Sequence, residues 1–275
     1  RRLGAMTRDG QLASNRRGVF GLVNKMDLIK GRIMGNKDGY GFVIPEDKSE
    51  DLFLGPKQMR KVFDGDTVLA KVIGLDRRGR REGKIVEVLE RKTDQFVGRF
   101  YSESGVGMVI PHSKRITQEI LIPPKKHKKA NDGDFVVVKI TQFPHEHHKA
   151  TGEVLEVLGD VSKPGMEIEV ALRTHDIPYE WPKEVLAQMK QYPARVDGNK
   201  EPDRVDLREL PFVTIDGEDA KDFDDAVCCQ RKRGKGFTLY VAIADVSHYV
   251  AVGSALDDEA QIRGNSVYFP GHVIP

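Results

Sequence analysis

Gly39-Tyr-Gly-Phe-Val-Ile-Pro45 recurs 66 residues later as Gly105-Val-Gly-Met-Val-Ile-Pro111. Two further blocks recur in the same order, at offsets of 68 and 69 residues. They are Asp64-Gly-Asp66, repeated as Asp132-Gly-Asp134, and Glu82–Leu89, repeated as Thr151–Leu158. Three matched blocks in one order indicate an internal duplication that organises the first half of the chain.

Each copy of the duplication predicts a small β-barrel. The apolar blocks are short, rich in Val, Ile and Phe, and separated by Gly, Asp and Pro. That composition is typical of strands joined by tight turns. About five such strands in roughly 65 residues fit a closed barrel of the OB type. We therefore expect a mainly β first half with two tandem OB-fold barrels, at residues 25–90 and 91–160.

Aromatic residues distinguish the first barrel from the second. Tyr40 and Phe42 are two positions apart, so they share one face of their strand. Together with Asp-Leu-Phe-Leu at 51–54, they resemble the cold-shock domain, where exposed aromatic rings stack on nucleic-acid bases. The alternative is that one or both rings belong to the barrel core. Val106 and Met108 occupy the matching positions of the second barrel, which predicts that it shapes a channel and contacts phosphates more than it stacks bases.

Two charged loops of the second barrel also allow a functional and a structural interpretation. The tract Lys125–Lys129 would suit phosphate contacts, although a run of charge is more commonly a solvated loop. A surface role also explains His145, His147 and His148 better than a metal site does.

The distribution of charge and the lengths of the apolar runs limit the class of protein. Residues 201–275 carry 8 Lys and Arg against 14 Asp and Glu, which leaves 36 against 28 for residues 1–200. A basic front and an acidic back suit a polyanion-binding part followed by a cation-binding part. No apolar run approaches the ~18 residues of a membrane span, and no secretory signal is present at the start. We expect a cytoplasmic protein without a membrane partner.

The acidic stretch Val213–Val227 carries the chemistry. Its aspartates stand at relative positions 0, 6, 8 and 9: Asp216, Asp222, Asp224 and Asp225. Carboxylates gathered this densely repel one another unless a cation is present. Mg²⁺ prefers oxygen ligands and shares them with substrate phosphates, so the stretch predicts a magnesium site. A solvated acidic loop is the structural alternative.

The stretch Ile215–Ala226 resembles the signature of the RNB-type exoribonucleases. Further runs similar to that family lie at residues 205–210, 241–247 and 263–270. The order of parts is also similar: a basic lead-in, two cold-shock-like barrels and the start of a catalytic domain. Two bacterial branches of the family share these parts, and the basic lead-in and the turn at 77–81 favour one of them.

The resemblance implies a 3′-to-5′ exoribonuclease that hydrolyses RNA and releases nucleoside 5′-monophosphates. It implies that Asp216, Asp222 and Asp225 hold Mg²⁺, and that loss of Asp224 abolishes chemistry while sparing binding. It also implies that Tyr268 stacks on the terminal base; a packed strand tyrosine is the alternative. The expected partners are single-stranded 3′ ends of RNA, and structured RNA as well.

The remaining segments complete the expected organisation. Residues 1–24 resemble the end of a basic winged-helix-like region, 161–210 form a linker, and 211–275 start an α+β catalytic domain. We expect this domain to be incomplete in the chain. The other hypothesis is an RNA-binding or chaperone module that acts through the paired barrels without catalysis.

Local signals in the last 100 residues predict two short helices. One starts at Pro182 and ends near Gln191, since proline suits the first turn of a helix. The other starts at a Ser254 cap and ends near Arg263. Asp245, at the end of an apolar strand, is interpreted as a residue with structural hydrogen bonds.

Overall fold

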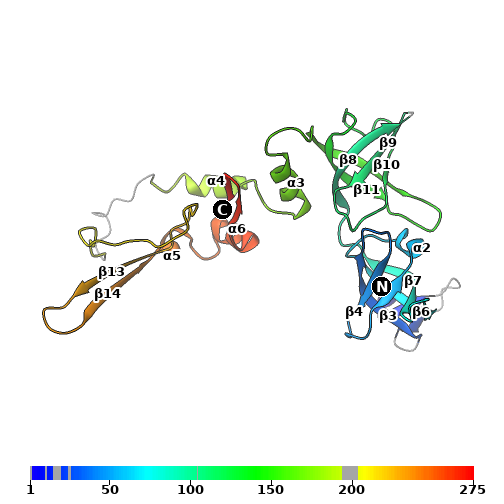
Figure 1. Ribbon diagram of the computed structural model, residues 1–275, viewed down its shortest axis with the longest axis horizontal. Helices are drawn as coiled ribbons and strands as arrows, with labels where there is room; N and C mark the ends of the chain where they lie inside the picture. The colour runs from blue at the N-terminus through cyan, green and yellow to red at the C-terminus, as the bar shows by residue number, and fades with distance from the viewer. Residues whose placement is uncertain (1, 10, 15–19, 24–25, 104, 194–203) are drawn as a thin grey trace. The chain divides into compact units, whose positions relative to one another are not determined.

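The computed structural model describes residues 2–9, 11–14, 20–23, 26–103, 105–193 and 204–275. It forms two compact units, Arg1–Asp176 and Ile177–Pro275. Two barrels make up most of the first unit (Figure 1). No helix in the described part is long and apolar enough to cross a membrane.

The first barrel is closed by five strands in the order β3-β4-β5-β7-β6. These are β3 (Leu28–Gly35), β4 (Gly41–Pro45), β5 (Leu52–Leu54), β6 (Thr67–Leu75) and β7 (Arg81–Glu90), with helix α2 (Pro56–Met59) after β5. Alternate residues point inward: in β4 and β5 the pattern of burial changes at every position. The inward side chains form one core, which includes Ile33, Val43, Leu52 and Val68.

The second barrel repeats this arrangement, in the order β10-β12-β11-β8-β9. Its strands are β8 (Gln95–Glu103), β9 (Val106–Pro111), β10 (Ile120–Ile122), β11 (Phe135–Gln142) and β12 (Ala150–Gly159). In both barrels the third strand pairs in parallel with the fifth, whereas every other pairing is antiparallel. The expectation of two tandem OB-type barrels is confirmed.

The repeated Asp-Gly-Asp block does the same structural work in both copies. The first aspartate accepts a hydrogen bond from a backbone amide near the end of the first strand of its barrel. Asp64 accepts from Gly35 of β3 at 2.8 Å, and Asp132 accepts from Ser102 of β8 at 2.9 Å. The second aspartate accepts a backbone N–H from three residues earlier and so closes the turn that precedes the fourth strand. Turn residues of this kind fix the entry of a strand, which explains why the block recurs with the strands.

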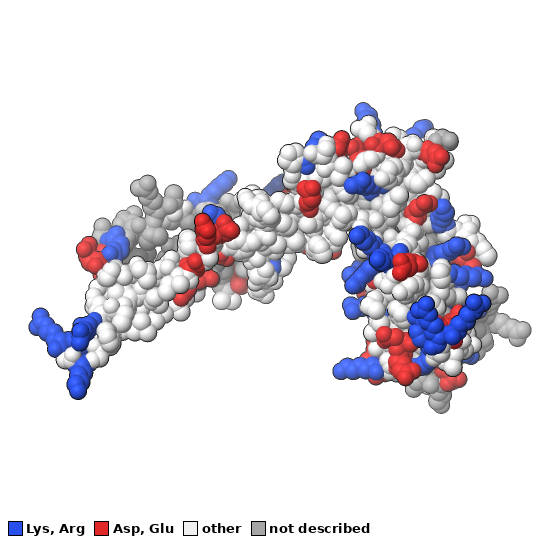
Figure 2. Space-filling view, viewed as in Figure 1, with Lys and Arg blue, Asp and Glu red and all other residues white. Residues whose placement is uncertain are grey.

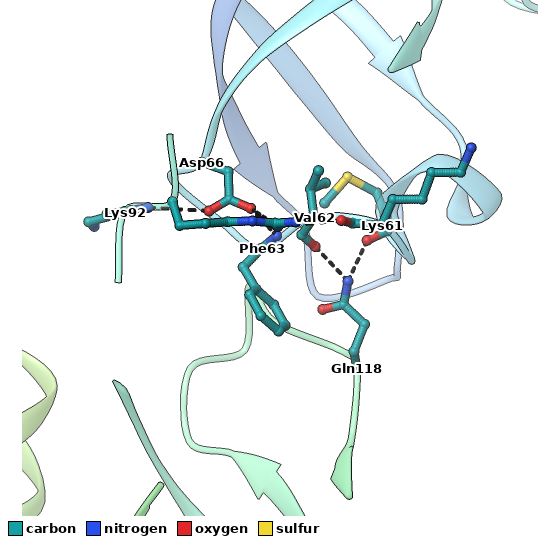
Figure 3. Close-up of polar contacts among 8 residues, drawn as sticks. Lys61, Val62, Phe63, Asp66, Lys92 and Gln118 are labelled. Atoms are coloured by element: carbon teal, nitrogen blue, oxygen red, sulfur yellow. Dashed lines mark hydrogen bonds and ion pairs between the residues drawn. The ribbon is translucent and has the colours of Figure 1, made fainter. Parts of the chain in front are cut away.

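The two barrels share core packing at their junction. Phe63 belongs by sequence to the first barrel, yet its ring is 1% exposed within the core cluster of the second and lies 4.8 Å from that of Phe96. In return, the Gln118 side-chain amide of the second barrel donates to the carbonyl oxygen of Met59. It also donates to that of Val62, at 2.6 Å (Figure 3). Phe63 of the first barrel thus fills part of the core of the second barrel. Gln118 of the second barrel donates hydrogen bonds to the backbone of the first.

A buried ion pair lies beside this junction. The carboxylate of Asp66, 1% exposed, accepts from the Arg91 guanidinium at 2.7 Å. It also accepts from the backbone amides of Phe63 and Lys92 (Figure 3). The same guanidinium is 4.6 Å from the ring centroid of Phe143, a residue of the second barrel. Arg91 thus joins the two barrels through one charge pair and one cation–π contact.

Helix α3 (Met166–Thr174) packs on the second barrel, inside the range that the sequence assigns to a linker. Met166 and Val170 lie in one buried cluster with Val97, Phe135 and Val137 of β8 and β11. The helix therefore belongs to the first unit. The basic lead-in contributes helix α1 (Arg2–Arg8) and the hairpin of β1 (Leu12–Ser14) and β2 (Phe20–Leu22).

The second unit consists of short helices and two hairpins. These are α4 (Lys183–Met189), β13 (Asp225–Arg231), β14 (Phe237–Ile243), α5 (Val246–Tyr249), α6 (Ala255–Arg263), β15 (Val267–Phe269) and β16 (His272–Ile274). Both predicted helices are present, and Ser254 caps α6 by accepting the Asp257 amide at 3.2 Å. The Arg263 side chain anchors α6 through a buried pair with Glu259 and a contact 3.6 Å from the Trp181 ring.

Candidate active site and RNA-binding surface

The predicted aspartates lie at the open end of the β13–β14 hairpin. They are Asp216, Asp222 and Asp224 in the segment before β13, and Asp225 at its first position. Two contacts hold the segment to the hairpin. The Ala244 amide donates to the Asp224 carbonyl at 2.7 Å, and Val213 and Val227 exchange backbone hydrogen bonds. The acidic stretch is thus tied to the hairpin at both of its ends by backbone hydrogen bonds.

Strand β15 brings Tyr268 to Asp222, although the two are 46 residues apart. The Tyr268 hydroxyl donates to one carboxylate oxygen of Asp222, and the Ser266 hydroxyl donates to the other at 3.2 Å. These hydrogen bonds, that of Tyr268 foremost, lower the pKa of Asp222, and the nearby carboxylate raises the pKa of Tyr268. Asp222 is therefore held in its ionised form, while Tyr268 stays 45% exposed.

The donor chemistry of the segment fits Mg²⁺, because carboxylate oxygens are the ligands that this ion prefers. The carboxylates are not gathered, however. Within the described ranges, no three His, Cys, Asp or Glu side chains lie close enough to hold a metal ion. Asp245, which the sequence assigns a structural role, pairs with Arg204 and accepts the Ser247 hydroxyl at 3.0 Å.

An aromatic cluster lies on the surface of the first barrel. Tyr40 and Phe42 share a face, as expected, with ring centroids 5.9 Å apart. Phe53 joins them from β5, at 5.8 Å from Tyr40 and 5.9 Å from Phe42. All three rings are partly exposed and lie outside the buried core. They form one patch of three rings, which we call the aromatic platform.

Sequence reasoning had named only two of these rings. Phe53 faces Phe42 directly across the β4–β5 ladder. The missed signal was present in the strand itself, since Leu52 and Leu54 point into the core and the residue between them must point outward.

Among its described residues, the second barrel has no equivalent platform, because Val106 and Met108 occupy the corresponding positions. Its basic tract is partly used within the barrel: the Lys126 ammonium is 2.5 Å from the Glu153 carboxylate, and that of Lys128 donates to the Leu155 carbonyl. The predicted surface histidines lie on an exposed turn between β11 and β12.

Charge is mixed over the barrels. In the view of Figure 2, Lys and Arg are interspersed with Asp and Glu there, and a separate basic group stands at the β13–β14 turn. The sequence places Arg231, Lys232, Arg233 and Lys235 at that turn. The acidic charge of the second unit is therefore concentrated away from the hairpin tip, toward its open end.

Comparison with known proteins identifies these parts. The Ribonuclease B OB domain family matches residues 31–88, the Cold shock domain family matches 108–182, and the RNB domain family matches 204–275. Over all 275 residues, the sequence is 52% identical to Ribonuclease R of Escherichia coli, and it is 50% identical to Ribonuclease R of Acidithiobacillus ferrooxidans over 277 residues. Along its whole length, the chain matches ribonuclease R. It spans 34% of the first relative and 63% of the second.

Solved structures of this fold include Mycoplasma genitalium RNase R with ribose-methylated single-stranded RNA. The TM-score is 0.77 at 24% identity, over 90% of this chain and 39% of that chain. Yeast Ssd1, a pseudonuclease, matches with a TM-score of 0.61 at 17% identity, over 92% of this chain and 38% of that chain. The fold thus occurs both in a ribonuclease and in a pseudonuclease, so the fold alone does not establish nuclease activity.

Proposed function

We propose that this chain supplies the RNA-binding barrels and the aspartate segment of a 3′-to-5′ exoribonuclease that hydrolyses RNA to nucleoside 5′-monophosphates with Mg²⁺. The observation that carries the proposal is the contact between Tyr268 and Asp222. Two residues to which the family resemblance assigns neighbouring roles, one at the terminal base and one at the metal, lie in direct contact. That contact would place the last nucleotide of an RNA beside the acidic segment.

The aspartates would act as a set. Asp216, Asp222 and Asp225 would hold Mg²⁺, which in such sites polarises the phosphodiester and activates a water molecule. Asp222 enters this set already ionised, because Tyr268 and Ser266 donate to its carboxylate and lower its pKa. The carboxylates are otherwise exposed and separate, so binding would have to draw them together. Asp224, in the same segment directly before β13, would serve the chemical step.

The aromatic platform would take the incoming strand. Stacking of bases on exposed rings is worth roughly 1–3 kcal/mol per base and tolerates any sequence, which suits an enzyme that degrades many RNAs. Mycoplasma genitalium RNase R has been solved with single-stranded and with double-stranded RNA. We propose single-stranded 3′ ends, including those that extend from structured RNA, as the substrate of this site.

The activity is tested with the intact protein, Mg²⁺ and an RNA that carries a single-stranded 3′ tail. Chromatography measures the release of nucleoside 5′-monophosphates. We expect release to be lost in Asp224→Asn while RNA binding persists, and to persist in Asp219→Asn, a matched acid of the same stretch. Release that continues in Asp224→Asn would contradict the proposed chemistry.

Metal binding has its own readout. Calorimetric titration of Mg²⁺ should show binding that is weakened in Asp222→Asn and unchanged in Asp219→Asn. Equal binding by both variants would remove Asp222 from the metal set, whatever the outcome of the activity assay.

A second function, RNA binding without catalysis, is favoured by one observation: the platform stands complete on a closed barrel, whereas the aspartates are not gathered. It predicts RNA binding that depends on Tyr40 and Phe42 in a chain that releases no nucleotides. Binding that is unaffected by Tyr40→Ala with Phe42→Ala would exclude the platform as the binding surface.

A further inference from the structure

The turn between β6 and β7 holds one arginine in a fixed position beside the aromatic platform. The Asp76 carboxylate accepts four hydrogen bonds inside this turn. One oxygen accepts the amides of Arg78 and Arg80, both at 2.9 Å, and the other accepts Nε and Nη2 of Arg80 at 2.8 and 2.6 Å. The turn is closed by Gly79, whose φ of +79° lies in the left-handed region that favours glycine.

The fixed guanidinium lies over the platform. Its central carbon is 4.0 Å from the ring centroid of Phe53 and 5.9 Å from that of Phe42. The Arg80 side chain remains 35% exposed, whereas Asp76 beneath it is 12% exposed. The Nη1 group of Arg80 has no hydrogen-bond partner in the part of the chain that the structure describes, so the guanidinium keeps free N–H groups and an accessible surface.

An arginine without these contacts would lose side-chain entropy on taking up this position. An exposed arginine carries about 2 kcal/mol of side-chain rotamer entropy, which ordering on RNA would have to offset. Here the ion pair and two side-chain hydrogen bonds to Asp76 order the guanidinium before any ligand arrives, and two backbone amides hold the Asp76 carboxylate in place. Arginine guanidinium planes are surfaces on which single-stranded RNA bases stack, as aromatic rings are. Preorganisation of this kind increases affinity by reducing the entropy lost on binding.

We propose that Arg80 is an RNA-binding residue whose guanidinium, positioned on Phe53 by Asp76, forms a fourth stacking surface of the aromatic platform for a base of single-stranded RNA. Asp76 is its positioning residue. The inference deepens the proposed function and rests on RNA binding by the first barrel. It extends the platform from the barrel wall to the β6–β7 turn and assigns that turn a specific task.

The charge of Arg80 and its planar surface make different predictions. A point charge that contacts phosphate is replaceable by lysine, and its loss lowers the salt dependence of binding. A stacked guanidinium is not replaceable by lysine, whose ammonium has no planar surface. Arg78 offers a matched control, since it lies in the same turn, carries the same charge and is exposed to solvent.

The test uses fluorescence anisotropy with the full 275-residue chain and a labelled single-stranded RNA of about eight nucleotides, at several salt concentrations. We expect Arg80→Ala and Arg80→Lys each to weaken binding roughly 5- to 10-fold, the range of a cation–π or stacking contact. Asp76→Asn should weaken it about 3-fold, because Arg80 is present but no longer fixed. Arg78→Ala should change it less than about 2-fold.

Each alternative outcome is specific. Binding that is unchanged or tighter in Arg80→Ala would show that Arg80 merely covers Phe53, and binding restored by Arg80→Lys would show a point charge; either result overturns the inference. Tyr40→Ala separates this failure from failure of the proposed function. If Tyr40→Ala weakens binding and the Arg80 variants do not, only the inference fails, whereas absence of binding by the unaltered chain overturns both. Circular dichroism checks that each variant is folded.

Discussion

Replacement of Arg91 by alanine should strongly destabilise the first barrel. The change leaves the carboxylate of Asp66, 1% exposed, without its counter-charge. Removal of one partner from a buried ion pair costs about 3–5 kcal/mol. Because Asp66 keeps the amide hydrogen bonds from Phe63 and Lys92, we expect the lower end of that range, about 3 kcal/mol. Lost contact with the Phe143 ring adds about 0.5–1 kcal/mol.

The loss should depend on pH in a defined direction. Burial raises the pKa of Asp66, against the opposing effects of the Phe63 amide and Arg91. A carboxyl whose pKa is higher in the folded than in the unfolded protein stabilises the fold below its unfolded pKa, and loses this contribution as pH rises through the folded pKa. Without Arg91 the folded pKa rises further. The deficit of Arg91→Ala should therefore be larger at pH 7 than near pH 4.5.

Urea denaturation followed by circular dichroism at both pH values measures this deficit, and amide hydrogen exchange assigns it to the first barrel. Arg99→Ala is the matched control, because Arg99 lies 5.1 Å from the Phe135 ring and has no ion pair among the described residues. It should cost only about 0.5–1 kcal/mol at either pH. A deficit for Arg91→Ala that is below ~1 kcal/mol, or equal at both pH values, would refute the reasoning about a buried charge.

Three further predictions follow from the packing. Gly98→Ala should destabilise the second barrel by about 1–3 kcal/mol in thermal denaturation, since its Cβ would lie 2.4 Å from a carbonyl oxygen of the neighbouring strand; Gly55→Ala, with no atom within 4 Å, should be nearly neutral. Tyr268→Phe should raise the pKa of Asp222, measured by carboxyl NMR titration, and an unchanged pKa would show that their hydrogen bond is absent in solution. Gln118→Ala should leave the Val62 carbonyl oxygen without its partner, remove one of the two donors to the Met59 carbonyl and cost about 1–3 kcal/mol, with faster amide exchange at the barrel junction; unaltered exchange would indicate that water replaces the amide.

The barrels were predictable because their signals are local and occur twice. The alternation of buried and exposed residues along a strand, and the residues that form turns, depend on neighbouring positions in the sequence. The duplication repeats both signals at nearly constant offsets. The capped helix α6 was predictable for the same reason: Ser254 and Asp257 are three residues apart, and the cap forms between them.

Contacts between distant segments were not predictable from one sequence. Nothing local marks Phe63 as a core residue of the other barrel or Gln118 as the partner of its loop. Likewise, the sequence suggested roles for Asp222 and Tyr268 by resemblance but not the hydrogen bond between them, which depends on how β15 returns to the acidic segment. Convergence of the aspartates, expected from their spacing, remains a prediction, because spacing fixes the distance along the chain and not in space.

The place of Phe63 has a consequence for inheritance. The ring contributed by the first copy fills the interior of the second, where loss of a buried phenylalanine costs about 3–5 kcal/mol. A recombination event that exchanged the first copy alone, with its breakpoint in the short segment between β7 and β8, would carry this ring away with it. Replacement of one barrel by an unrelated barrel would therefore destabilise the other. Selection is expected to keep the two barrels together.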